Sequence, residues 1–185
     1  MKAFKGIRLL FSKAVVLGII FSITHCCQGQ IIPSTKVFEG PAPVTSLAYG
    51  NGTFVGVGGG FWSVSNNGSN WAVKANAPII NNGGVAFGNG MFLAFGTNMQ
   101  SEANLILQST NGTSWTPIFA PPTTLTAAAY GNSTWVFIGT SGITVDSVVG
   151  NSNHWTQFLP PFSPTCITFG NGVFVIGVMR LGAPV

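Results

Sequence analysis

The sequence predicts an all-β fold built from repeated units, and two observations carry that prediction. A ten-residue pattern with a Gly-Asn pair near its start occurs four times. The apolar runs around that pair are short, rich in Val, Phe, Ile and Tyr, and interrupted by glycine, which favours strands over helices. The four copies are YGNGTFVGVG (49–58), FGNGMFLAFG (87–96), YGNSTWVFIG (130–139) and FGNGVFVIGV (169–178).

Each copy predicts a β-hairpin. Asn-Gly between two apolar runs is the strongest short-range hairpin signal, because both residues tolerate the positive φ of a type I′ turn. The Gly-Asn pairs are 38, 43 and 39 residues apart, and self-similarity near 40 residues indicates a solenoid or a propeller. The predicted turn residues are Asn51, Gly52, Asn89, Gly90, Asn132, Asn171 and Gly172.

A third apolar run and a second turn follow the hairpin in the first three units. They read FWSVSNNGSNWAV, LILQSTNGTSWTPI and ITVDSVVGNSNHWTQF, each of which predicts strand, turn, tryptophan and strand. Each unit is therefore expected to be a four-stranded antiparallel meander of about 40 residues, the size of one β-propeller blade. The tryptophans and the aromatic residue before each Gly-Asn pair are expected to pack between blades. The residues concerned are Asn67, Gly68, Asn111 and Gly112 in the turns, and Trp71, Trp115 and Trp155.

The predicted fold class is all-β, a β-propeller-like array of four-stranded antiparallel blades. Three units are complete and a fourth has only its first hairpin, so the ring is incomplete. The units span about 44–82, 83–124, 125–163 and 164–185, and residues 30–43 form a linker or a closing outer strand. A closed propeller needs roughly four to eight blades. Three explanations stay open: a piece of a longer propeller, which we favour, a ring closed by two chains, or a small irregular barrel.

The basic residues are concentrated at the N-terminus. The net charge of +4 comes from Lys2, Lys5, Arg8 and Lys13, since the remaining three basic and three acidic side chains balance. A nucleic-acid groove needs a stripe of Lys and Arg, so no nucleic-acid partner is expected.

The basic start followed by the apolar run at 14–23 predicts a secretory signal peptide over 1–29, cleaved before Gln30. The apolar run is shorter than the roughly 20 residues of a bilayer span, which disfavours an uncleaved anchor. The residues before Cys26 and Cys27 match a lipid-attachment site poorly. We expect a secreted protein, extracellular or periplasmic, without membrane association after cleavage.

Two of the second turns carry a resemblance to a known family. SNNGSNW (65–71) and STNGTSW (109–115) resemble the Asp-box, or bacterial neuraminidase repeat, of the form Ser-x-Asp-x-Gly-x-Thr-Trp. The whole unit resembles the secreted sialidase-like and kelch-like propeller repeats. The resemblance implies that Ser65 and Ser109 stabilise a turn and take no part in catalysis. Asn67 and Asn111 stand where the family has Asp, and the box is one residue shorter.

The catalytic set of a glycosidase is missing from this pattern. Such enzymes use paired carboxylates, and sialidases use a Tyr nucleophile. After the predicted cleavage site the chain has one Arg, and its three acids fall in separate segments. No catalytic residue, metal site or cofactor is expected, and the sequence favours a protein without enzymatic activity.

We therefore expect a secreted, non-catalytic, propeller-type repeat module that binds a carbohydrate or protein partner through its loops. One alternative is a fragment of a secreted sialidase-like glycoside hydrolase whose catalytic residues lie outside this chain. Another is a structural spacer in a larger surface protein. The partner is not identified by the sequence, and a homodimer or a longer parent chain are both compatible with it.

Overall fold

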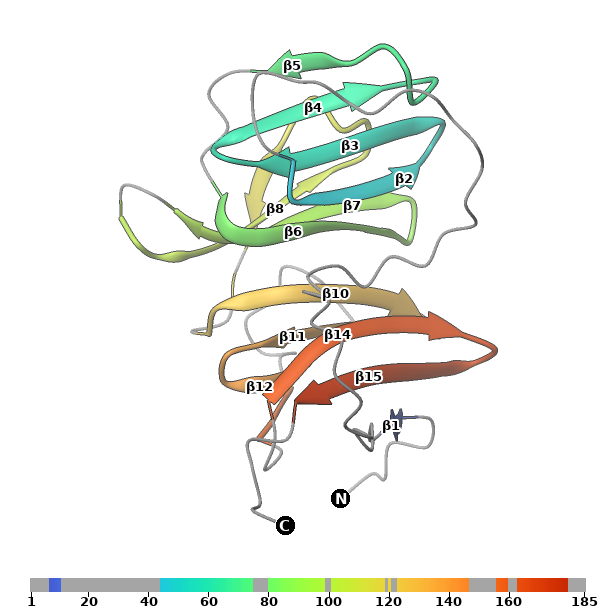
Figure 1. Cartoon of the computed structure of the whole chain (residues 1–185), viewed down its shortest axis with the longest axis vertical. Coiled ribbons are helices and arrows are strands. Elements are labelled where there is room, and N and C mark those ends of the chain that lie inside the picture. The colour runs from blue at the N-terminus through green and yellow to red at the C-terminus, as the bar shows by residue number, and fades with distance from the viewer. Residues whose placement is uncertain are drawn as a thin grey trace, which may run out of the picture.

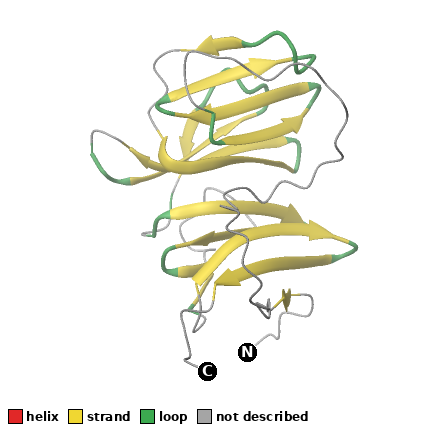
Figure 2. Ribbon diagram, viewed as in Figure 1, coloured by secondary structure: helices red, strands yellow, loops and turns green. Residues whose placement is uncertain are grey.

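The computed structural model describes residues 7–10, 44–74, 80–98, 101–118, 120, 123–146, 156–159 and 163–179. All regular structure in this part of the chain is β, as Figure 2 shows. The prediction of an all-β fold with four units is confirmed: the strands form four separate sheets. No helix long and apolar enough to cross a bilayer occurs among these residues.

Three of the sheets are four-stranded antiparallel meanders in chain order. The first sheet contains β2 (Ser46–Gly50), β3 (Thr53–Gly58), β4 (Phe61–Ser65) and β5 (Ala72–Lys74). The second contains β6 (Ile80–Gly88), β7 (Met91–Asn98), β8 (Asn104–Ser109) and β9 (Thr116–Ile118). The third contains β10 (Leu125–Gly131), β11 (Thr134–Gly139), β12 (Gly142–Asp146) and β13 (Thr156–Phe158).

The fourth sheet is built on the hairpin of β14 (Ser163–Gly170) and β15 (Val173–Met179). A short strand, β1 (Ile7–Leu10), pairs in parallel with the outer edge of β15. The sequence did not predict this strand, because Ile7–Leu10 lies within the predicted signal peptide. The rest of that segment, and the predicted linker or closing strand at 30–43, lie outside the described residues.

The four hairpin turns share one backbone conformation. Each has two successive residues with positive φ: 48° and 74° at Asn51 and Gly52, and 51° and 72° at Asn89 and Gly90. The last turn, Asn171 and Gly172, has 48° and 77°. A positive φ at both central residues is the signature of a type I′ turn, whose twist matches the twist of the flanking strands. In the third turn a serine, Ser133, adopts 56° where the other copies have glycine.

Consecutive sheets pack face to face, with their first strands side by side. β2 contacts β6, β6 contacts β10, and β10 contacts β14. The first sheet lies at the top of Figure 1, and β15 of the fourth sheet lies near the bottom. Three apolar cores fill the three spaces between consecutive sheets. Each inner sheet therefore buries both of its faces.

Every core contains an aromatic pair from the hairpin of the later sheet. The rings of Phe87 and Phe92 are 4.8 Å apart in the first core. Tyr130 and Trp135, 5.1 Å apart, belong to the second core. Phe169 and Phe174, 4.8 Å apart, belong to the third. The first sheet has the same pair, Tyr49 and Phe54 at 4.4 Å, and no earlier sheet within the described residues covers it.

The glycine before each turn leaves room for the aromatic residue of the next sheet. A Cβ atom at Gly50 would overlap the Phe87 ring, and one at Gly88 would overlap Tyr130. A Cβ at Gly131 would overlap the Phe169 ring. These three glycines therefore allow consecutive sheets to approach closely. The sequence pattern alone indicated only that they belong to a hairpin turn.

Candidate functional site

The turns between β4 and β5 and between β8 and β9 have the same hydrogen bonds. In the first, the Ser65 hydroxyl oxygen accepts from the backbone N–H of Asn67 at 3.3 Å and of Gly68 at 2.9 Å. In the second, Ser109 accepts from the N–H of Asn111 at 3.3 Å and of Gly112 at 2.8 Å. We name the segments Ser65–Trp71 and Ser109–Trp115 the first and second box turns.

The asparagine of each box turn acts as an acceptor. Oδ1 of Asn67 accepts from the N–H groups of Ser69 and Asn70 at 2.9 and 2.8 Å. It also accepts from the hydroxyl of Ser65 at 3.2 Å. Oδ1 of Asn111 receives the three equivalent bonds, at 2.9, 2.9 and 3.1 Å. A carboxylate could accept all of them, which matters because the Asp-box has Asp here.

The tryptophan closes each box turn. Trp71 Nε1 donates to the carbonyl of Gly68 at 3.1 Å, and Trp115 Nε1 donates to that of Gly112 at 3.2 Å. The Trp115 ring lies 5.7 Å from the ring of Trp62 and packs against the first core, between the first two sheets. These contacts show that the serine, the asparagine and the tryptophan of each box turn stabilise the turn itself. The third predicted tryptophan, Trp155, lies outside the described residues.

The second box turn also lies against the first sheet. A Cβ at Gly112 would be 2.5 Å from Val55, 3.6 Å from Val64 and 3.7 Å from Thr53. The side-chain amide of Asn51 donates to the carbonyl of Thr110 at 2.9 Å. The second box turn therefore packs against β3 and β4 of the sheet that precedes it.

The hairpin tips are joined by side-chain amides. Asn51 Nδ2 also donates to the carbonyl of Gly90 at 2.9 Å, and Asn132 Nδ2 donates to that of Gly172 at 3.0 Å. Each bond runs from the tip of one sheet to the tip of the next. Within the described residues, the side chain of Asn89 makes no such bond to the third tip, where Ser133 replaces glycine.

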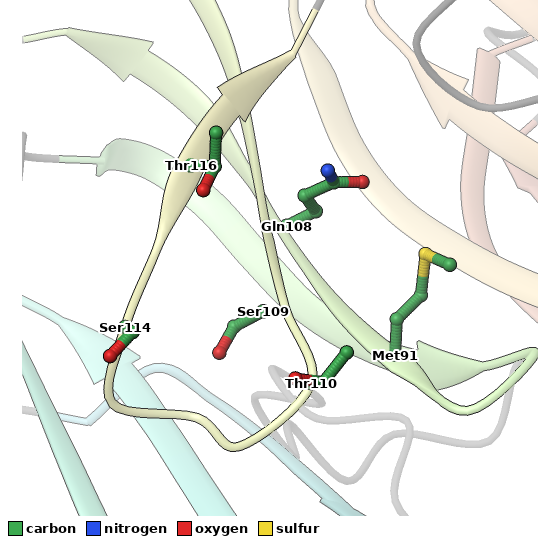
Figure 3. Close-up of a pocket in the computed structure, with 6 residues that line it drawn as sticks. All are labelled: Met91, Gln108, Ser109, Thr110, Ser114 and Thr116. Atoms are coloured by element: carbon green, nitrogen blue, oxygen red, sulfur yellow. The ribbon is translucent and has the colours of Figure 1, made fainter.

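A pocket of about 330 Å³ opens beside the second box turn. Figure 3 shows its lining side chains around the loop that joins β8 to β9. Gln108 and Thr116 form a cross-strand pair on the face of the second sheet that looks toward the third, and Met91 packs against the second core. The lining residues are Met91, Gln108, Ser109, Thr110, Ser114 and Thr116.

The pocket lies where the repeat pattern changes. Gln108, Thr116 and Met91 occupy the positions that Val64, Ala72 and Thr53 hold in the first sheet.

In the first sheet, Val64 and Thr53 lie under the second box turn, whereas Ala72 is exposed. The equivalent third turn at 147–155 is longer and degenerate in sequence, and it lies outside the described residues. Sequence reasoning missed the pocket, although the change from Val64 and Ala72 to Gln108 and Thr116 was a readable signal.

The pocket is uncharged, and five polar side chains line it together with the apolar Met91. Hydroxyl groups come from Ser109, Thr110, Ser114 and Thr116, and Gln108 adds an amide. In the described part of the chain the Gln108 side chain has no hydrogen-bond partner, so both its donor and its acceptor atoms are available. No group of three or more His, Cys, Asp or Glu side chains occurs among the described residues. The arrangement suits the binding of a neutral hydroxylated ligand.

No family model and no curated protein matches the chain. Among solved structures, it is similar to the computationally designed Ika4 protein, with 14% identity and a TM-score of 0.51. That match covers 77% of this chain and 89% of Ika4. The match to the designed Ika8 protein has 13% identity and a TM-score of 0.48, over 73% of this chain and 42% of that one.

The GH32 β-fructofuranosidase BmSUC1 of Bombyx mori gives 13% identity and a TM-score of 0.39, over 73% of this chain and 42% of the enzyme. The chain thus spans less than half of the last two proteins. Of these three likenesses, the one to Ika4 bears on this chain, and it concerns the fold alone.

Proposed function

We propose that the chain is a secreted, non-catalytic repeat module with propeller-type blades, which binds carbohydrate hydroxyl groups in the pocket beside Gln108. The observation that carries the proposal is that Gln108 and Thr116 line a pocket in the second sheet, where the first sheet has the apolar side chains of Val64 and Ala72. The Gln108 amide and the hydroxyls of Thr110, Ser114 and Thr116 can exchange hydrogen bonds with sugar hydroxyls without burying a charge.

The propeller assignment is part of this proposal. The first strands of consecutive sheets lie side by side, and each of the first three sheets is a four-stranded meander, as in propeller blades. The two box turns support kinship with Asp-box repeats, because Asn67 and Asn111 accept the bonds that an Asp would accept. Secretion is supported by the signal-like N-terminus in the sequence.

The test is binding of the full chain to an array of neutral and acidic oligosaccharides, followed by calorimetry with the best saccharide. Gln108→Met keeps the size of the side chain and removes the amide. We expect binding to weaken by about tenfold, since one or two net hydrogen bonds are worth roughly 1–1.5 kcal/mol. Ser114→Ala should weaken binding less, because Ser114 is exposed at the rim.

Asn70→Ala is the matched control for Ser114→Ala. Asn70 holds the same position in the first box turn, away from the pocket. It should leave the affinity unchanged. If Gln108→Met leaves the saccharide affinity unchanged, the saccharide binds at a site other than this pocket. A chain that binds no saccharide but captures a protein ligand would refute the carbohydrate proposal.

A further inference from the structure

The three interfaces between sheets use one set of positions, in a fixed direction. The face of the earlier sheet contributes the glycine before the turn, and the face of the later sheet contributes the aromatic residue that lies over it. The pairs are Gly50 with Phe87, Gly88 with Tyr130, and Gly131 with Phe169. The interface is therefore heterologous: two different surfaces meet, and each sheet has one of each kind.

The first sheet leaves its aromatic face uncovered. Tyr49 is 58% exposed and Leu47 is 61% exposed. At the position of Leu47, the second sheet has Val85, which is only 6% exposed. Phe54 is half-buried, whereas its counterparts Phe92, Trp135 and Phe174 are 0%, 2% and 4% exposed. We name this surface, formed by Leu47, Tyr49 and Phe54, the aromatic face.

The fourth sheet leaves its glycine face uncovered. A Cβ built at Gly170 has no heavy atom within 4 Å, in contrast to Gly50, Gly88 and Gly131. Val175 is half-buried, although the residues at its position in the earlier sheets, Val55, Leu93 and Val136, are each 0% exposed. Thr168 on the same face is exposed. We name this surface, formed by Thr168, Gly170 and Val175, the glycine face.

We propose that the glycine face of one chain is the docking site for the aromatic face of a second copy of the same chain. Tyr49 of the second copy would lie over Gly170, as Phe169 lies over Gly131 within the chain. Asn171 would donate to the carbonyl of Gly52 of the second copy, as Asn132 donates to that of Gly172. The contact would continue the three interfaces already present and would repeat their geometry.

The chemistry of the two faces fits this occupant. The three residues that define each face are uncharged, so their contact buries no unpaired ion of their own. The two faces belong to different sheets, the first at the top and the fourth near the bottom of Figure 1, so each face can contact another copy. A heterologous contact closes into a ring when the rotation allows it, and otherwise grows into an open chain.

The test is sedimentation equilibrium of the full chain, expressed with its own N-terminus, over a wide range of protein concentrations. The wild-type chain is expected to associate, as a closed dimer or as a longer open series. Gly170→Val should abolish association while keeping the fold, because a Cβ at this position has no heavy atom of the described residues within 4 Å and the backbone there is not left-handed. Tyr49→Lys, on the opposite face, should abolish it as well.

Two controls make the outcome decisive. Leu159→Lys removes another exposed apolar side chain, 76% exposed and on neither face, and should leave association intact. Circular dichroism checks that Gly170→Val is folded. If the valine variant unfolds, Gly170→Ser is used in its place in the association measurement.

A wild-type chain that stays monomeric, including one that closes its own two ends together, would overturn the proposal. So would association that survives both Gly170→Val and Tyr49→Lys, or additional repeats in the same polypeptide covering the two faces.

Discussion

The side-chain amide of Asn132 donates a hydrogen bond of 3.0 Å to the carbonyl oxygen of Gly172, at the tip of the next sheet. Asn51 makes the equivalent bond to Gly90 and adds a second to Thr110, both at 2.9 Å. Asn89 has the same backbone conformation, with φ at 51°, and no side-chain hydrogen bond within the described residues. Asn51, Asn89 and Asn132 thus have the same backbone conformation and differ in the number of hydrogen bonds that their side chains donate.

This difference predicts an order of stability for Asn→Gly variants. Glycine tolerates the positive φ, so its backbone cost is similar at each site and the lost hydrogen bonds decide the ranking. Asn51→Gly should cost most, Asn132→Gly less, and Asn89→Gly least, with about 0.5–1.5 kcal/mol for each bond. Urea unfolding measures the series. Equal losses at all three sites would show that the tip bonds add nothing to stability.

Gly131→Ala and Gly170→Ala form a second pair. The added methyl at Gly131 overlaps the Phe169 ring, and at Gly170 it meets nothing within 4 Å. Overpacking costs about 1–3 kcal/mol, so Gly131→Ala should lower the free energy of unfolding by roughly that amount. Gly170→Ala should change it by less than about 0.5 kcal/mol. Chemical denaturation at low protein concentration, where any association is absent, makes the comparison. A neutral Gly131→Ala would mean that the sheets can move apart freely.

The acceptor role of Asn111 predicts that Asn111→Asp keeps the fold. Every bond to its Oδ1 is accepted, and a carboxylate accepts more strongly than an amide oxygen. We expect thermal stability at neutral pH to be equal or higher, and the gain to disappear in acid when the carboxyl group is protonated. Asn111→Leu, which cannot accept, should be destabilised by about 1–3 kcal/mol. Loss of the fold in Asn111→Asp would contradict the assigned bond directions.

Gly112→Ala and Gly68→Ala separate packing from backbone strain. Both glycines have positive φ, 73° and 71°, so both variants carry the same conformational cost. The Cβ at Gly112 would also press against Val55, whereas at Gly68 the nearest atom is 3.7 Å away on Phe54. Gly112→Ala should therefore be the more destabilising by about 1 kcal/mol or more. Calorimetric melting of the two variants would test whether the second box turn is fastened to the first sheet.

The meander of each sheet could be predicted because it depends on local chemistry. The turns at Asn51 and Asn171 need positive φ, and the neighbouring apolar runs fit only strands. The contact of Gly50 with Phe87 could not be predicted in the same way, since it joins residues of different sheets. The pocket depends on how the second and third sheets differ, and only comparison of Val64 with Gln108 between units would have indicated it. The strand at Ile7–Leu10 could not be predicted, because these residues belong to a segment whose composition is typical of a signal peptide.

The fixed direction of the contacts between sheets has a consequence for how such a chain can evolve. Each sheet presents the same glycine surface forward and the same aromatic surface backward. A gene duplication that inserts one unit therefore brings together the same two kinds of surface. Units can be gained or lost without redesign of their neighbours, as in other repeat proteins where each unit contacts only the adjacent ones. Selection can then act on a single divergent unit, such as the one that carries Gln108, while the others preserve the framework.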